Sequence, residues 1–138
     1  WYQNYINFAV EKNYISGDEN GLCRPEDMIS RAEFASIIAR YINIEPLDGE
    51  DKFTDIARFD WCKKYINALA EKGIVTGYEN DEFLPDNKLT RSEAVAIINR
   101  ITDRKMTTEI LEKLTCPFSD VSETHWAYND ILLAACEY

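Results

Sequence analysis

The chain has 138 residues, a hydrophobic fraction of 46% and a charged fraction of 29%, which suit one ordinary globular domain and exclude a disordered tail. Its formal net charge of −10 argues against nucleic acid as a partner, because phosphate contacts need a basic surface. No apolar run reaches the roughly 18 residues that a membrane span needs, and the start at Trp1 without an initiator Met reads as a piece of a longer protein.

The sequence repeats itself at a spacing of 60 residues. Trp1 aligns with Trp61, and the segment SRAEFASIIAR, which begins at Ser30, aligns with TRSEAVAIINR, which begins at Thr90. A third copy begins near Phe118, and only its first half lies within the 138 residues. A fixed period of this kind indicates a repeat architecture, in which no unit buries its apolar faces alone.

We therefore predict a single domain, residues 1–138, built from helix–loop–helix repeats. Repeat one spans residues 1–42, repeat two spans residues 53–101, and the first half of a truncated repeat three spans residues 118–138. A polar linker that contains Pro46 joins the first two repeats.

Each repeat is predicted to begin with a helix led by a tryptophan. In repeat two, six apolar residues recur at helical spacing and define one face: Trp61, Cys62, Tyr65, Ile66, Leu69 and Ala70. Gly73 and its counterpart Asn13 tolerate the left-handed conformation and should end these helices. We expect three such helices to pack together as a bundle core. Their tryptophans then either pack in that core or stay partly exposed as platforms for a sugar ring.

A glycine loop follows each first helix and contains Gly17 or Gly77. The stretch from Ser16 to Asp27 resembles a calcium-binding loop in part. It departs from that pattern because it has Ser at its first position, Pro25 inside it and Asp rather than Glu at its twelfth position. We therefore predict no metal site in this loop.

The four cysteines, Cys23, Cys62, Cys116 and Cys136, form no C-x-x-C pair, so their spacing predicts no zinc site. We expect free thiols, with disulfides as the alternative if the protein is extracellular. Cys23 aligns with Phe83 and is therefore predicted to be a small buried hydrophobic residue.

Both second helices begin with the pattern of a capping box, Ser30-x-x-Glu33 and Thr90-x-x-Glu93. In this motif the hydroxyl accepts a hydrogen bond from the third amide of the helix, and the glutamate accepts one from the amide of the hydroxyl residue. The pattern needs no ligand to explain it, and losing the cap should cost about 1 kcal/mol.

The capping box does not explain Arg31 and Arg91, which stand at the first helical position beside the positive end of the helix dipole. Free amides at a helix start together with a guanidinium form a receptor for an anion. The alternative is an ion pair with a nearby carboxylate such as Glu33, or simple exposure to solvent.

Several polar residues are assigned to local turns and helix starts. Thr108 is predicted to cap a short helix that runs through Leu114. His125 is predicted to be a helix-start residue, and it supports no catalytic role because no partner nucleophile is evident. Asp55 and Asp120 follow phenylalanines at the entries to helices and are predicted to be local caps.

Together, several short motifs resemble the S-layer homology domain. They are F-x-D before a tryptophan-led helix, GIVTGY from Gly73, F-x-P from Phe83 and LTRSE from Leu89, and ISRAE from Ile29 is similar. The resemblance covers nearly the whole chain. It implies an all-α, three-pronged pseudo-trimer of repeats, here with a three-helix-bundle core, outer second helices and a truncated third repeat. It also implies noncovalent attachment of surface proteins to secondary cell-wall polysaccharide, which often carries ketal-linked pyruvate.

In the family that this chain resembles, the polymer sites lie in grooves between prongs and use the motif arginine, the loop glycine and an aromatic residue. Carried over to this sequence, the polymer-binding residues are Arg31, Arg91, Gly17, Gly77, Trp61 and Trp126. Repeat one departs from the pattern, because Asp18 stands where repeat two has Tyr78 and Cys23 replaces an aromatic residue.

We therefore predict a non-catalytic anchoring module, extracellular at the cell surface or in the cell wall, that binds a pyruvylated or otherwise anionic polysaccharide and needs no cofactor. The acidic chain should repel an anionic polymer, but salt screens this repulsion beyond about 8 Å. A charge-assisted hydrogen bond of about 1.5–3 kcal/mol can outweigh it. The alternative is a scaffold for protein–protein interaction or self-assembly on the cell surface. The unfinished third repeat also predicts an exposed apolar patch and weak self-association.

Overall fold

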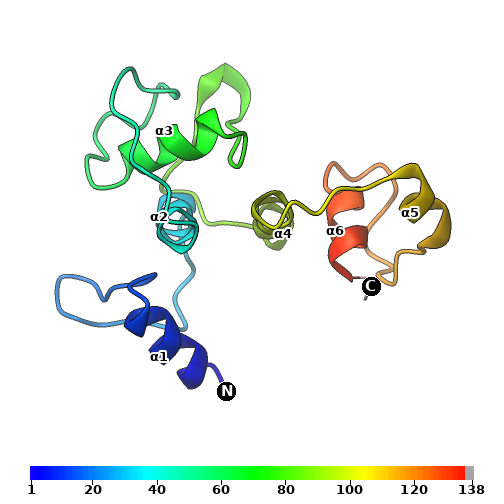
Figure 1. Cartoon of the computed structure of the whole chain (residues 1–138), viewed down its shortest axis with the longest axis horizontal. Coiled ribbons are helices and arrows are strands. Elements are labelled where there is room, and N and C mark those ends of the chain that lie inside the picture. The colour runs from blue at the N-terminus through cyan, green and yellow to red at the C-terminus, as the bar shows by residue number, and fades with distance from the viewer. Residues whose placement is uncertain (136–138) are drawn as a thin grey trace. The chain divides into compact units, whose positions relative to one another are not determined.

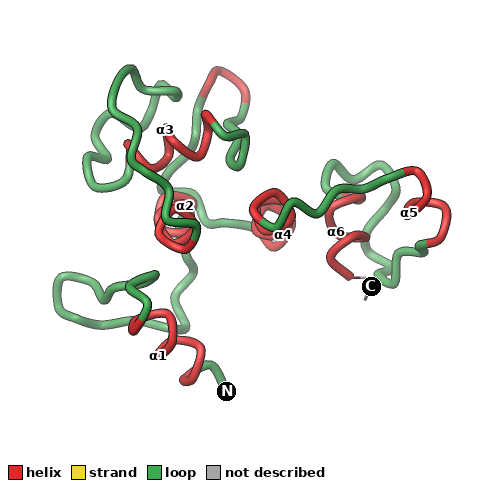
Figure 2. Tube along the Cα trace, viewed as in Figure 1, coloured by secondary structure: helices red, strands yellow, loops and turns green. Residues whose placement is uncertain are grey.

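The computed structural model describes residues 1–135, and these form helices joined by long loops, with no strand among them (Figures 1 and 2). The elements follow in the order α1 (Gln3–Glu11), α2 (Arg31–Tyr41), α3 (Lys63–Glu71), η1 (Glu79–Asp81), α4 (Arg91–Ile101), α5 (Thr108–Lys113) and α6 (Tyr128–Ala135). The predicted all-α class is therefore confirmed. Within this described part, no helix is both long and apolar enough to cross a membrane.

The chain divides into two compact units, Trp1–Leu89 and the residues from Thr90 onward. The first unit contains α1, α2 and α3, and the second contains α4, α5 and α6. The division falls inside predicted repeat two, between its loop and its second helix. The repeat boundaries given above stay predictions.

In the first unit, α2 packs against α3. The covered face of α2 is made largely of small residues, and Ala32, Ala35 and Ala39 are almost completely buried. Small side chains at a contact allow two helices to approach closely. From α3, Ile66 and Leu69 have no exposed surface. The second helix of repeat one therefore packs against the first helix of repeat two.

The second unit uses the same pairing, because α4 packs against α6. Ile97 on α4 and Leu132 and Leu133 on α6 are buried. A polar link accompanies this apolar contact: the Nδ2 group of Asn99 donates to the backbone oxygen of Asp130 at 2.9 Å and to its carboxylate at 3.0 Å. The helix expected in repeat three is thus present, and it is held by the second helix of repeat two.

The predicted packing of the tryptophan-led helices against one another is not found within the first unit. The helix that covers α3 is α2, and α1 has no buried residue. α2 is also not an outer arm, since six of its residues are buried. Apolar spacing identified the buried face of α3 correctly, but spacing alone does not say which helix covers a face.

The helix ends follow the sequence closely. In both capping boxes the hydroxyl accepts from the third helical amide, at 3.2 Å for Ser30 and 3.3 Å for Thr90. Asn13 and Gly73 take left-handed conformations, with φ of 59° and 68°, and end α1 and α3 as predicted. The cap of α5 is Thr107 rather than Thr108, one residue earlier than expected.

The cysteines are only partly as predicted. Cys23, Cys62 and Cys116 are free thiols, and Cys136 lies outside the described residues. Cys23 is exposed, so the prediction that it is buried is wrong. Its counterpart Phe83 is buried because the Phe53 ring, 5.3 Å away between centroids, and a guanidinium cover it.

Candidate functional site

The guanidinium of Arg31 is inserted into the loop of repeat two. Its Nε donates to the backbone oxygen of Phe83 at 2.8 Å, and its Nη2 donates to that of Thr76 at 3.1 Å. The guanidinium carbon lies 4.6 Å from the Tyr78 ring centroid and 4.7 Å from that of Phe83, both within the range of a cation–π contact. Arg31 is 6% exposed, so its charged group stabilises this loop from inside.

The amides at the start of α2 are also occupied. The amide of Arg31 donates to the backbone oxygen of Asn87 at 2.9 Å, and that of Ala32 donates to Pro85 at 3.0 Å. Glu33 closes the capping box by accepting from the amide of Ser30 at 2.8 Å, and it does not pair with Arg31. The expectation of free amides for an anion at this helix start is therefore wrong, because the loop of repeat two fills them.

Asp55, near the start of repeat two, binds the loop of the same repeat through hydrogen bonds. Its two carboxylate oxygens accept from the amide of Phe83 at 2.9 Å and from that of Leu84 at 2.8 Å. Asp55 is therefore not a local cap as predicted, since its partners lie 28 and 29 residues away. The aspartate of the F-x-D motif fixes the loop into which Arg31 inserts.

Gly77 lies in this loop, and the space around it explains the glycine. A Cβ atom at position 77 would lie 2.6 Å from the Phe53 ring and 2.8 Å from the backbone oxygen of Glu82. Gly17 is constrained in the same way, because its Cβ would lie 2.7 Å from the backbone of Gly21. Both predicted site glycines are thus required by close backbone approach, whatever else they contact.

A groove of about 840 Å³ lies in the first unit, beside the loop of repeat one. Its walls are the loop residues 15–18, 22–25 and 27–29, one side of α2, and the side chains of Trp61 and Lys88. Gly17 and Trp61, both predicted from the sequence, meet in this groove. Trp61 is 54% exposed, so its ring offers an open face.

The charged residues of the groove balance one another, with three cations and three carboxylates: Arg24, Arg40, Lys88, Asp18, Asp27 and Glu33. Arg24 pairs with Asp18 at 3.3 Å and with Asp27 at 3.7 Å. Neutral walls in a chain of net charge −10 make this groove less repulsive to an anion than the average surface.

Asp18 is engaged in the turn of the repeat-one loop. One of its oxygens accepts from the amides of Leu22 and Asn20, both at 2.9 Å. The bond from Leu22 lowers the pKa of the Asp18 carboxyl, and Asn20 and the Arg24 cation add to the effect. This carboxylate therefore stabilises the turn through its backbone hydrogen bonds. The calcium-like pattern would instead make it a ligand of the metal ion.

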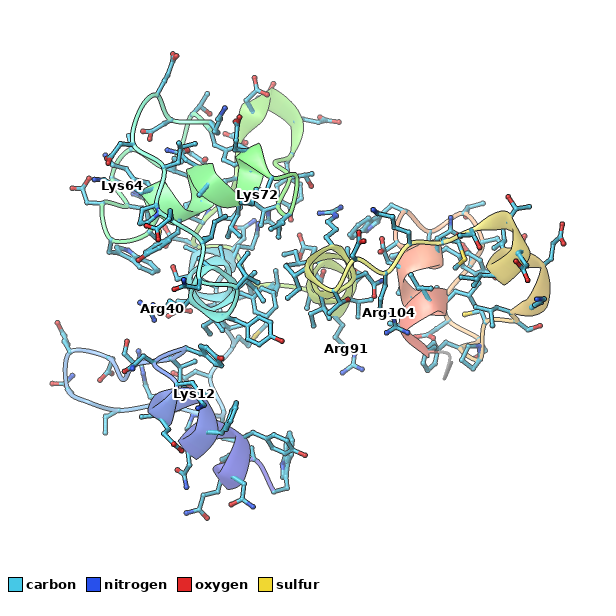
Figure 3. The ribbon with its side chains drawn as sticks, in the orientation of Figure 1. Lys12, Arg40, Lys64, Lys72, Arg91 and Arg104 are labelled. Atoms are coloured by element: carbon cyan, nitrogen blue, oxygen red, sulfur yellow. The ribbon has the colours of Figure 1, made fainter. Side chains whose placement is uncertain are left out.

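The remaining predicted site residues lie in the second unit. Arg91 is exposed and extends away from α4 (Figure 3), with no hydrogen bond or ion pair to the described residues of its own unit. Trp126 is 62% exposed, with its ring 5.9 Å from that of His125. His125 accepts from the amide of Ala127 through Nδ1 at 3.1 Å, and it lies in the turn before α6, three residues ahead of the helix start at Tyr128.

Core packing of the tryptophans is ruled out, because Trp1, Trp61 and Trp126 are all more than half exposed. The structure groups the predicted residues as Gly17 with Trp61 in the groove and Arg31 with Gly77 in the loop of repeat two.

Two groove residues were missed from the sequence, Arg40 and Lys88. Arg40 recurs as Arg100 at the repeat spacing, which was an available clue. Lys88 aligns with Met28, so the repeat gave no clue to it. It reaches the groove because Ser30 and Lys88 form an isolated antiparallel bridge.

Comparison with known proteins gives consistent matches. A family model described as "S-layer homology domain" matches residues 1–35 and 52–95. A "Cellulosome-anchoring protein" of Acetivibrio thermocellus is 33% identical over 138 residues, which cover 95% of this chain and 29% of that protein. An "S-layer protein" of Bacillus licheniformis is 33% identical over 71% of this chain and 11% of its own length. An "Endoglucanase" of a Bacillus species is 34% identical over 72% of this chain and 10% of its own length. The chain thus spans less than a third of each of these relatives.

Proposed function

The chain belongs to the S-layer homology domain family, and on that premise we propose that it anchors a larger protein by binding an anionic cell-wall polysaccharide without covalent chemistry. Its family and its surface-layer relatives locate it outside the cell, at the surface or in the wall. The anchoring role at the cell surface follows from the same relatives. The proposal adds the ligand, a polysaccharide that carries ketal-linked pyruvate or another negative group.

The observation that carries the proposal is the groove that joins Gly17 and Trp61. The face of an indole ring is electron-rich and attracts the C–H groups of a sugar ring. Because the loop at Gly17 has no side chain, a bound sugar can approach the backbone there. The volume of about 840 Å³ suits a ligand of a few sugar units.

The polymer-binding residues of the proposal are distributed over the two units. Trp61 and Gly17 contact the sugar in the groove, and Arg31 and Gly77 hold the adjoining loop of repeat two. In the second unit, exposed Arg91 and Trp126 provide a guanidinium and a ring for a further contact. An arginine at the first helical position opposes the helix dipole, so its presence at Arg91 is easier to understand if it binds an anion.

We include in the proposal that the chain itself performs no catalysis. The resemblance to an endoglucanase covers a tenth of that protein, which leaves most of its length for other domains.

The test is sedimentation of the purified chain with cell-wall sacculi of Acetivibrio thermocellus, before and after extraction of the wall polysaccharide. We expect binding to intact sacculi that weakens as salt rises, and no binding after extraction. Equal binding to extracted and intact sacculi would refute a polysaccharide ligand.

A second candidate function, a scaffold for protein interaction, is favoured by one observation. α1 and the residues just before it carry exposed apolar side chains, of which Trp1 is 98%, Tyr5 73% and Phe8 54% exposed. The counterparts of Tyr5 and Phe8 in repeat two lie on α3, which α2 covers. Sedimentation of the chain at increasing concentration tests this function: concentration-dependent association that Tyr5→Ser abolishes would support it.

A further inference from the structure

The anion of the bound polymer needs a cation in the groove, and the motif arginine does not supply it. We propose that Arg40 and Lys88, rather than Arg31, recognise negative groups of a glycan that lies on Trp61. This inference rests on the proposed function, because it takes the groove as the polysaccharide site.

Arg31 is unsuited to the ligand because its guanidinium is already used. It is 6% exposed, lies between the Tyr78 and Phe83 rings and donates to two backbone oxygens. To reach a ligand, the guanidinium would have to break both hydrogen bonds and leave both rings. This would remove the contacts that stabilise the loop of repeat two. The groove walls accordingly include Glu33, Ser36 and Arg40 of α2 but not Arg31.

Arg40 has the donors that Arg31 lacks. It stands in the last turn of α2 and lines the groove, and Figure 3 shows it projecting from that helix. One of its terminal nitrogens makes a long hydrogen bond, 3.4 Å, to the backbone oxygen of Tyr14. No carboxylate among the described residues of its unit pairs with it. Its planar fork can therefore hold a carboxylate or phosphate through two parallel hydrogen bonds.

Lys88 supplies the second charge from beside the start of α2, whereas Arg40 stands in the last turn of that helix. Its backbone is fixed to repeat one, because the amide of Leu89 donates to the backbone oxygen of Ile29 at 3.2 Å beside the bridge between Ser30 and Lys88. The Lys88 side chain is exposed and has no ion pair within the described part of the first unit. It can therefore approach an anion as a mobile point charge.

The other charges of the groove are committed. Arg24 is shared between Asp18 and Asp27, and Glu33 accepts from the amide of Ser30. Arg40 and Lys88 are thus the groove cations without a carboxylate partner. Arg40, Lys88 and Trp61 line the same groove, with the two cations near opposite ends of α2. The ring can therefore contact a sugar while each cation contacts a negative group of the glycan.

The test compares five variants of the whole chain with wild type by their dissociation constants for Acetivibrio thermocellus sacculi over a series of salt concentrations. Arg40→Gln and Lys88→Gln remove the proposed contacts, singly and together. Lys72→Gln is the matched control, because Lys72 is an exposed cation at the end of α3 and outside the groove (Figure 3). Arg31→Lys keeps the charge of the motif residue but removes its planar fork. Circular dichroism melts establish that each variant is folded at the temperature of the assay.

We expect Arg40→Gln to weaken binding about tenfold, as for loss of a charge-assisted hydrogen bond. The double variant should weaken it further and flatten the salt dependence. Lys72→Gln should stay within about twofold of wild type, and Arg31→Lys should lower the melting temperature with a similarly small change in affinity. Mild-acid removal of ketal-linked pyruvate and phosphatase treatment of the sacculi show which anion is recognised.

Two results would overturn the inference while leaving the proposed function intact. One is a double variant that binds polymer-bearing sacculi as wild type does, with an unchanged salt dependence. The other is loss of binding in Arg31→Lys at an unchanged melting temperature. If the wild type itself does not bind intact sacculi, or binds extracted ones equally, the proposed function fails and the inference fails with it.

Discussion

Arg31 and Arg91 occupy the same position of the same motif, and we predict that alanine has opposite consequences at the two sites. Arg31→Ala should destabilise the fold strongly, because it removes a buried guanidinium with two backbone acceptors and two aromatic contacts. Arg91→Ala should leave stability nearly unchanged, because Arg91 is exposed. The pair is a matched control, since each variant removes one positive charge at the first position of a capped helix.

The magnitude follows from the contacts. Hydrogen bonds from a charged donor contribute about 1.5–3 kcal/mol each, and a desolvated cation–π contact about 1–2 kcal/mol. These contributions overlap because the same group makes them, so we expect a loss of about 3–5 kcal/mol for Arg31→Ala. A domain of this size has about 5–15 kcal/mol of total stability, so the loss is a large fraction of it. An exposed substitution such as Arg91→Ala should lie within about 0.5 kcal/mol of wild type.

The assay is urea unfolding followed by circular dichroism, with both variants and wild type in the same buffer. The difference between the two free energies of unfolding is the decisive quantity. If Arg31→Ala costs less than about 1 kcal/mol, or no more than Arg91→Ala, the guanidinium does not stabilise the loop and the account of Arg31 is wrong. Arg91→Ala is expected to weaken binding to sacculi even though its stability is retained.

Three further predictions concern single residues. Gly77→Ala should lower the free energy of unfolding by about 1–3 kcal/mol, because the added carbon would overlap the Phe53 ring; unchanged urea unfolding would contradict the close approach. Thr90→Ala should cost about 1 kcal/mol in the same assay through loss of its cap, and a stability equal to wild type would show that the cap contributes nothing. Burial raises the pKa of the Cys62 thiol to about 12, so at pH 8 it stays protonated in the native protein and should react with iodoacetamide far more slowly than exposed Cys23; equal labelling rates by mass spectrometry would refute this.

Local features of this chain could be predicted from the sequence because their partners lie within a few residues. The capping boxes at Ser30 and Thr90 and the left-handed ends at Asn13 and Gly73 depend on short-range hydrogen bonds and backbone sterics, and the structure has all four.

Features with distant partners could not be predicted in the same way. The carbonyl partners of Arg31 lie 45 and 52 residues further along the chain, so no local pattern distinguishes it from exposed Arg91. The cover of α3 by α2 was missed for a related reason, because periodicity defines an apolar face and not its partner. Lys88 entered the groove through a backbone bridge to Ser30 that has no signature in sequence.

The most direct measurement of the central claim is a nuclear magnetic resonance titration of the isotope-labelled chain with polysaccharide released from sacculi. The three indole N–H signals, from Trp1, Trp61 and Trp126, report separate parts of the surface. We predict that the Trp61 indole and the Gly17 amide shift and reach saturation together, while the Trp1 indole, which precedes α1, does not shift. An unmoved Trp61, or shifts confined to α1, would contradict the groove as the site of polymer binding.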